Sequence, residues 1–397
     1  MKKTVVAILK ASSWKEYALF KKHPEYLAIF NLIERHRDLN FVLTGTSKSA
    51  LSRYLIKDNV VAWDIPVPHG LIGHFTTQLH LFRIFLETRP RLIISMGLLN
   101  VVPSLIFSFF SPKSKVAPIF IGEFDYHGRK IVGRLLNFVQ FKIMSIVLRL
   151  SQTKIANAFA LSRWEREGIE KMAPNMKGKI RLVSYPISSL FYCTKRKLDE
   201  DKNIPILLTV AGIEPRKGLD VLVKAISLLP MDIRPRVVIK GGIRDHFYMQ
   251  QLVRLVEKLS LVDWIQFDNS IIDYATLWQY YQAATLFVFP TREDCLGVVV
   301  LEALHSGLPV VATSVGGIPD MVQNGVNGIL IEPNSPQELS NVISWLLKDK
   351  ASRDYLARNA VSTLRNQYYD RMSLEDAFEK SVQDLQKSFV IVRLPTQ

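Results

Sequence analysis

The residues best suited to chemistry lie in Pro290 to Val322, PTREDCLGVVVLEALHSGLPVVATSVGGIPDMV. An apolar run predicts a strand that ends at Pro290, and a helix is expected to begin near Leu296 and Gly297. The first N–H groups of a helix have no partner inside it and lie at the positive end of its dipole, so they suit a phosphate-bearing ligand. Leu296, Gly297 and Val298 are therefore candidate diphosphate-binding residues, and Gly297 leaves room for close approach.

Two carboxylates flank this helix start. Asp294 lies just outside the predicted helix and Glu302 lies inside it, so both project from a similar face. Carboxylates accept hydrogen bonds from sugar hydroxyls, each worth about 1.5–3 kcal/mol. One carboxylate would bind a sugar and the other a ribose. The alternative is that Asp294 only caps the helix and Glu302 sits on a solvated face.

A second phosphate-ready turn is predicted in residues 207–229, LLTVAGIEPRKGLDVLVKAISLL. A buried strand runs into a turn at Gly212, and a helix is expected to open at Gly218. Arg216 and Lys217 lie at the mouth of that helix, where their charges would suit a diphosphate. The alternative is a solvated basic loop.

Together these segments resemble the family-4 retaining glycosyltransferases of GT-B fold, whose signature is a Glu, seven residues and a second Glu, followed by GGxxE. The second segment is similar to the family's GRxxxxKG block. The matching positions are Pro290, Gly297, Leu301, Glu302, Ala303, Gly307, Pro309, Val310, Val311, Ala312, Gly316, Gly317 and Lys217.

The resemblance implies a GT-B fold, an α/β architecture of two facing Rossmann-like domains with parallel sheets and a cleft between them. It also implies transfer of a sugar from a nucleotide-diphosphate donor to a hydroxyl acceptor with retained configuration. Fixed cations and helix N–H groups would stabilise the departing diphosphate, so neither a metal ion nor a cofactor is expected. By the same resemblance Asp294 is a candidate catalytic residue, and Lys217 and Glu302 are candidate donor-binding residues.

The sequence departs from the family pattern at three positions. Asp294 and Asp320 each replace a Glu, which keeps the carboxylate and shortens its reach by one methylene. Glu293 is adjacent to Asp294 and could compensate, with its spacing shifted by one. Ile213 stands where the family has an Arg that contacts the diphosphate, so Arg216 is the expected substitute.

In the first half, the segment GEFDYHGRK falls where the family often has a His-Asp pair at a strand end. Asp125 and His127 are therefore candidate catalytic residues on the acceptor side. In direct register Phe124 takes the family's His position, and a hydrogen-bonded loop histidine is the alternative for His127.

The elements that must position these residues alternate strand and helix along the 397-residue chain, which predicts two α/β domains with mainly parallel sheets. The expected boundaries are an acceptor-binding domain at 1–185, a proline-bounded linker at 186–205 and a nucleotide-sugar-binding domain at 206–370. A C-terminal amphipathic helix at 371–397 is expected to return to the first domain. The uncharged stretch 92–110 is interpreted as a buried strand, turn and helix, with a membrane span as the alternative.

The net charge of +15 lies in the first half, because residues 1–185 carry 28 Lys and Arg against 12 Asp and Glu. Residues 129–154 hold six cations, no acid and apolar residues at helical spacing, a pattern typical of helices that lie on a membrane surface. An ordinary helix packed on a sheet is the alternative. No nucleic-acid-binding motif accompanies the basic half.

These features predict a cytoplasmic protein held peripherally at the inner face of a membrane, with a lipid-linked acceptor or membrane glycan precursor. Two cysteines, Cys193 and Cys295, are too few for a disulfide framework, which indicates a reducing compartment. A non-catalytic donor-binding or regulatory protein remains one alternative function, and a nucleotide-sugar epimerase of the same fold remains another.

Overall fold

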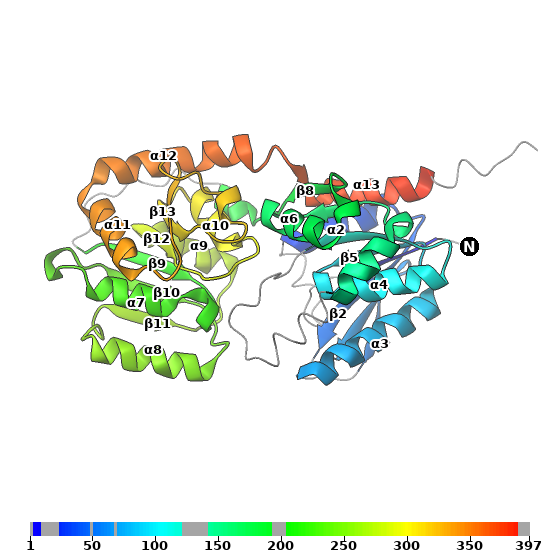
Figure 1. The fold of residues 1–397 in the computed structure, drawn as a ribbon, viewed down its shortest axis with the longest axis horizontal. Helices are drawn as coiled ribbons and strands as arrows, with labels where there is room; N and C mark the ends of the chain where they lie inside the picture. The colour runs from blue at the N-terminus through cyan, green and yellow to red at the C-terminus, as the bar shows by residue number, and fades with distance from the viewer. Residues whose placement is uncertain are drawn as a thin grey trace, which may run out of the picture. The chain divides into compact units, whose positions relative to one another are not determined.

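The computed structural model describes residues 3–8, 24–47, 51–66, 70–120, 142–192 and 204–387, which divide into two compact units (Figure 1). Unit 1 comprises Met1–Pro186 and Met372–Gln397, and unit 2 comprises Ile187–Arg371. Both units pair a parallel sheet with helices, so the predicted α/β class is confirmed.

Unit 1 is built on a nine-stranded sheet of order β15-β8-β7-β6-β5-β1-β2-β4-β3, parallel except where β3 runs antiparallel to β4. Its named elements are β1 (Thr4–Ile8), α2 (Pro24–Arg35), β2 (Asn40–Ser47), β3 (Ser52–Lys57), β4 (Val60–Pro66), α3 (Gly70–Thr88), β5 (Leu92–Met96), α4 (Leu98–Phe110), β6 (Lys115–Phe120), η2 (Gln152–Lys154), β7 (Ala158–Ala160), α6 (Arg163–Met172), η3 (Pro174–Met176), β8 (Ile180–Ser184), β15 (Met372–Ser373) and α13 (Leu374–Lys387).

The uncharged stretch 92–110 forms the strand, turn and helix predicted from its glycine and proline. All five residues of β5 are buried, Gly97 turns the chain with φ 89°, and α4 follows directly. In the described residues, none of the helices combines the length and apolar character needed to cross a membrane.

The C-terminal segment completes unit 1. Strand β15 pairs with β8 and forms one edge of the sheet, and α13 packs against α2. Polar contacts accompany this packing, since Asn31 Nδ2 donates to Glu375 at 3.1 Å and His36 Nε2 lies 3.0 Å from Glu379.

Unit 2 is built on a six-stranded, fully parallel sheet of order β11-β10-β9-β12-β13-β14. Its elements are η4 (Ser189–Tyr192), β9 (Ile206–Val210), η5 (Pro215–Lys217), α7 (Leu219–Ser227), η6 (Met231–Ile233), β10 (Arg236–Lys240), α8 (His246–Lys258), β11 (Ile265–Asp268), α9 (Tyr274–Ala283), β12 (Leu286–Phe289), α10 (Val298–His305), β13 (Val310–Thr313), η7 (Ile318–Asp320), β14 (Gly328–Ile331), α11 (Pro336–Lys348) and α12 (Lys350–Gln367).

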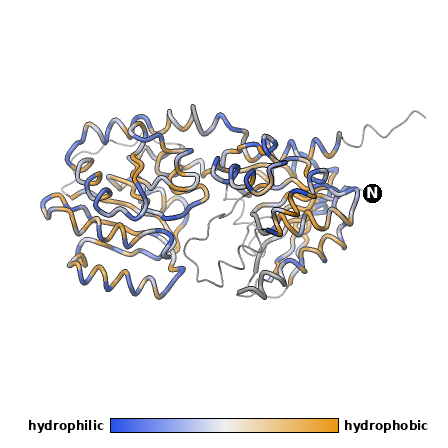
Figure 2. The backbone as a smooth tube through the Cα atoms, viewed as in Figure 1, coloured by the Kyte–Doolittle hydropathy of each residue, from blue (hydrophilic) through white to orange (hydrophobic). Residues whose placement is uncertain are grey.

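This strand order is that of the Rossmann fold, in which the chain first builds outward from one central strand and then returns to build the other half. The reversal falls between β9 and β12, which are hydrogen-bonded neighbours. Figure 2 shows hydrophobic residues along the strands and alternating hydrophilic and hydrophobic residues along α8. Ligands of such sheets bind beyond the carboxyl ends of the strands at the reversal, so a ligand is expected to bind at the loops after β9 and β12.

Candidate functional site

The loops that follow β9 and β12 are in direct contact, and glycines make that contact possible. Gly218 has φ 64°, and a Cβ added there would lie 2.0 Å from the carbonyl oxygen of Pro290. Gly316, in the loop after β13, has φ 55°, and its added Cβ would lie 1.6 Å from the carbonyl oxygen of Asp294. Neither position could accept a side chain without moving the backbone, so glycine is required at both.

Arg292 joins the two loops by main-chain and side-chain hydrogen bonds. Its backbone N–H donates to the Arg216 carbonyl at 2.7 Å, and its Nη1 donates to the Pro215 carbonyl at 2.6 Å. Its guanidinium also binds both carboxylate oxygens of Asp220 at 2.8 and 2.9 Å. Burial raises the pKa of Asp220, but hydrogen bonds from Arg292 and Tyr248 outweigh it and lower that pKa. The contacts hold the turn that carries Lys217 against the loop that carries Asp294.

Lys217 and Asp294 form an ion pair at this junction. Lys217 Nζ lies 2.6 Å from Asp294 Oδ2, and the two side chains are 9% and 18% exposed. The other carboxylate oxygen, Oδ1, accepts the N–H of Leu296 at 3.2 Å and of Gly297 at 2.8 Å. Asp294 therefore closes the turn that precedes α10, whose N-cap is Gly297 without a side-chain cap, and it is also the counter-ion of Lys217.

Glu302 lies on α10 and is buried rather than solvated, with 6% exposure. Its Oε2 accepts a hydrogen bond from the Tyr281 hydroxyl at 2.8 Å. Tyr281 is completely buried on α9, with its ring against those of Phe191 and Phe287. Burial and then the Glu302 carboxylate raise the pKa of Tyr281, so its hydroxyl stays protonated and donates. The Glu302 carboxylate is thus held in one orientation.

The remaining predicted donor residues lie in the loops after β9 and β12 and at the start of α10. Arg216 Nη2 pairs with Glu214 Oε1 at 2.9 Å, and Arg216 Nη1 donates to the Glu293 carbonyl at 3.4 Å. Gly212 forms the turn after β9. Leu296 has a buried side chain and Val298 begins α10. The candidate acceptor residues Asp125 and His127 lie outside the described residues.

Sequence spacing did not identify Tyr281 or Arg292. Tyr281 is 21 residues from Glu302, and Arg292 is 72 residues from Asp220. No local sequence motif indicates either pair, because each forms only when the sheet brings two distant segments of the chain side by side. Within the described ranges, no group of three or more His, Cys, Asp or Glu side chains is arranged to hold a metal ion.

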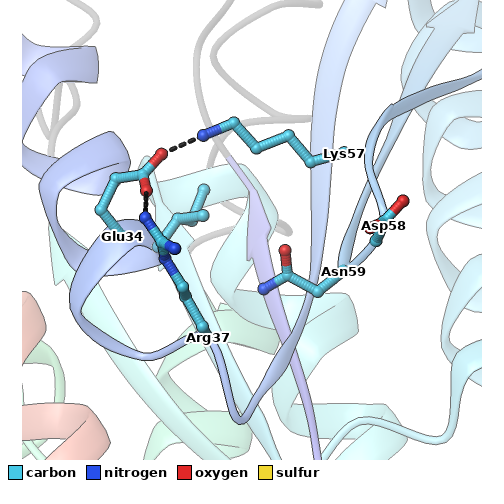
Figure 3. A pocket seen from close by; sticks show the side chains of 6 residues that line it. Glu34, Arg37, Lys57, Asp58 and Asn59 are labelled. Carbon is cyan, nitrogen blue, oxygen red and sulfur yellow. Dashed lines mark hydrogen bonds and ion pairs between the residues drawn. The ribbon is translucent and has the colours of Figure 1, made fainter.

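Unit 1 has a surface pocket lined by α2 and the β3–β4 turn (Figure 3). Glu34 there pairs with Lys57 and, at 2.9 Å, with Arg37. The pocket adjoins the amino end of β4, the edge opposite to that used by ligands of parallel sheets. Exposed ion pairs of this kind contribute little to stability, and the pocket is a surface charge cluster.

Residues 194–363 match the family model described as Glycosyl transferases group 1. The matched segment covers most of unit 2 and includes the loops after β9 and β12, with Lys217, Asp294 and Glu302. It accounts for the resemblance stated from the sequence, although the family-4 subdivision is not distinguished by this match.

Curated relatives are similar to about two fifths of the chain. D-inositol 3-phosphate glycosyltransferase of Streptosporangium roseum is 31% identical over 175 residues, which are 42% of this chain and 40% of that protein. The same-named protein of Thermobifida fusca is 32% identical over 166 residues, 40% of this chain and 38% of that protein. The matched segments thus span about two fifths of these relatives' length.

Solved structures match nearly the whole chain in fold. Sucrose-phosphate synthase from Thermosynechococcus elongatus has a TM-score of 0.72 at 17% identity, covering 98% of this chain and 100% of that one. Anabaena HepE in complex with UDP-glucose has a TM-score of 0.70 at 15% identity, covering 97% and 99%. These are GT-B glycosyltransferases, so the predicted GT-B fold is confirmed.

Proposed function

We propose that this chain is a glycosyltransferase that moves a sugar from a nucleotide-diphosphate donor to a hydroxyl acceptor. The observation that carries the proposal is the Lys217–Asp294 pair at the strand-order reversal of a glycosyl transferases group 1 domain. The named relatives are glycosyltransferases, and HepE is solved with UDP and with UDP-glucose. A diphosphate is the ligand chemistry that a buried lysine beside a helix start favours.

In the proposed reaction, Lys217 and the N–H groups of Leu296, Gly297 and Val298 stabilise the negative charge that grows on the departing diphosphate. Removing one such contact typically reduces the rate about 10²–10³-fold. Gly212 allows close approach of the donor, and Arg216 contributes charge at the edge of the turn. Because these groups supply the stabilisation, we propose that the reaction needs neither a divalent metal nor a cofactor.

The carboxylates bind the sugar parts of the donor. We assign Glu302 to the ribose, because Tyr281 fixes its carboxylate, and Asp294, with Glu293 beside it, to the transferred sugar. Retention of anomeric configuration is part of the proposal. Asp125 and His127 remain the proposed acceptor-side catalytic residues.

We also propose a lipid-linked acceptor or membrane glycan precursor and peripheral attachment at the cytoplasmic face of a membrane. Residues 142–150 form a helix on which Ile143, Ile146 and Leu150 are 47%, 57% and 66% exposed. Their spacing places them on one side, while Met144 and Leu148 are buried on the other. An exposed apolar stripe on a strongly basic unit suits an anionic lipid surface.

The test of the donor site is thermal stabilisation by UDP-, GDP- and ADP-sugars, measured on the wild type, Glu302→Gln and Tyr281→Phe. A bound donor raises the melting temperature. We expect one donor to stabilise the wild type, Glu302→Gln to lose most of that effect, and Tyr281→Phe to keep part of it. No stabilisation by any of the three would contradict the proposed donor site, and binding without transfer would favour the non-catalytic alternative.

The membrane proposal is tested by sedimentation with vesicles of neutral or anionic lipid. We expect binding only to anionic vesicles, and weaker binding for Ile146→Ser. Ile271→Ser, at a fully exposed apolar position of unit 2, is the matched control and should bind like the wild type. Equal binding by Ile146→Ser and the wild type would remove this helix from the proposal.

A further inference from the structure

The cations at the carboxyl edge of the unit 2 sheet are paired with carboxylates, with one exception. The ion pairs are Lys217 with Asp294, Arg216 with Glu214, Lys240 with Asp268 and Arg292 with Asp220. The exception is Arg244, which is exposed in the loop after β10. In the part of the chain that the structure describes, its guanidinium takes part in no hydrogen bond or ion pair.

Arg244 lies beside the turn that follows β9. The loops after β9 and β10 form a bridge between Ile213 and Ile243, and the Arg244 N–H donates to the Ile213 carbonyl at 3.1 Å. A Cβ added at Gly212 would lie 3.0 Å from Arg244 Cγ and 3.7 Å from Arg244 Nε. The arginine side chain therefore runs across the open face of Gly212.

We propose that Arg244 is a diphosphate-binding residue of the donor site, an inference that rests on the proposed function. A diphosphate ester carries several negative charges, whereas Lys217 and Arg216 are each already matched by a carboxylate. Arg244 supplies positive charge that is not already in an ion pair, and the nearby Glu214 carboxylate is paired with Arg216. Its planar guanidinium can donate two parallel hydrogen bonds to phosphate oxygens.

The experiment is calorimetric titration of the full chain with inorganic pyrophosphate and with UDP. Arg244→Gln is expected to weaken binding of both by about 10- to 100-fold, as for loss of a charge-assisted hydrogen bond. Arg244→Lys should recover part of the affinity. The control Arg236→Gln removes the same charge from an exposed side chain at the amino end of β10, and it should bind like the wild type.

Three results would overturn the inference in distinguishable ways. If Arg244→Gln binds like the wild type while Lys217→Ala loses affinity, the proposed donor site is supported and Arg244 does not bind the diphosphate. If Arg244→Gln weakens UDP but not pyrophosphate, Arg244 contacts the nucleoside and the diphosphate assignment is wrong. If the wild type binds neither UDP nor another nucleoside diphosphate, the proposed function itself falls.

Discussion

Replacing Asp294 with asparagine or alanine is expected to destabilise unit 2 by different amounts, because its carboxylate makes two kinds of contact. Loss of the negative charge leaves Lys217 with a buried, uncompensated ammonium. Removing one partner of a buried ion pair costs about 3–5 kcal/mol, and the 18% exposure of Asp294 favours the lower end. The oxygen that accepts the N–H groups of Leu296 and Gly297 makes hydrogen bonds in the turn before α10, worth about 1 kcal/mol.

Asparagine keeps an oxygen that can accept these two N–H groups, and alanine does not. We therefore expect a loss of about 3 kcal/mol for Asp294→Asn and about 4 kcal/mol for Asp294→Ala. Two units can unfold separately, so a single melting curve does not isolate the effect. Hydrogen–deuterium exchange of peptides that contain β9 and β12 reports the opening free energy of unit 2 alone.

The double variant Lys217→Met with Asp294→Asn closes the cycle. When both charges are removed, neither is left uncompensated, so much of the loss should be recovered. We expect a coupling free energy of about 2 kcal/mol or more between the two positions. A coupling below about 0.5 kcal/mol, the usual error of additivity, would mean that the pair does not form in solution, and the charge argument for the site would fail.

Two further outcomes follow from the geometry of unit 2 and of unit 1. Gly218→Ala should lower the stability of unit 2 by several times more than Gly178→Ala lowers that of unit 1. Both glycines have positive φ, but only Gly218 would bring its Cβ within 2.0 Å of the Pro290 carbonyl, and equal losses in exchange would contradict that close approach. Hydrogen bonding from Lys240, with help from neighbouring hydroxyls, lowers the pKa of Asp268, so its stabilisation is present above the unfolded pKa of about 3.9 and is lost as the pH falls below it. Stability measured from pH 6 to pH 2 should therefore fall less steeply in Asp268→Asn than in the wild type, and parallel curves would refute this.

The sequence predicted unit 2 well because each strand there is a short apolar run bounded by a turn residue. The alternation of strands and helices in the sequence predicts helices at 246–260 and 335–348, and the structure has them at His246–Lys258 and Pro336–Lys348. Helix α12 (Lys350–Gln367) was missed, since its buried side chains are few and most of its residues are polar. Strand β3 was missed because it is an edge strand whose residues are all exposed or half-buried.

The candidate residues could be named from local spacing, but their partners could not. Spacing along a helix or a turn identified Asp294, Glu302 and Lys217. The ion pair between Lys217 and Asp294 joins residues 77 apart, and it exists because the sheet places β12 beside β9. Strand order is a property of long-range packing that no local motif encodes, so the sequence predicted two phosphate-ready turns without predicting their contact.

Asp294 stands where the family pattern has a Glu, and its shorter side chain changes which groups the carboxylate binds as well as how far it extends. A shorter side chain favours hydrogen bonds to backbone N–H groups two and three residues ahead, and Asp294 makes both. The carboxylate is thereby drawn back onto the start of α10, where its second oxygen meets Lys217. A diphosphate must compete with this internal anion for the same lysine and the same N–H groups. We therefore expect Asp294→Asn, although less stable, to bind pyrophosphate more tightly than the wild type, by about tenfold for each 1.4 kcal/mol of competition removed. Titration of both proteins with pyrophosphate measures this, and weaker binding by Asp294→Asn would show that Asp294 assists the diphosphate instead of competing with it.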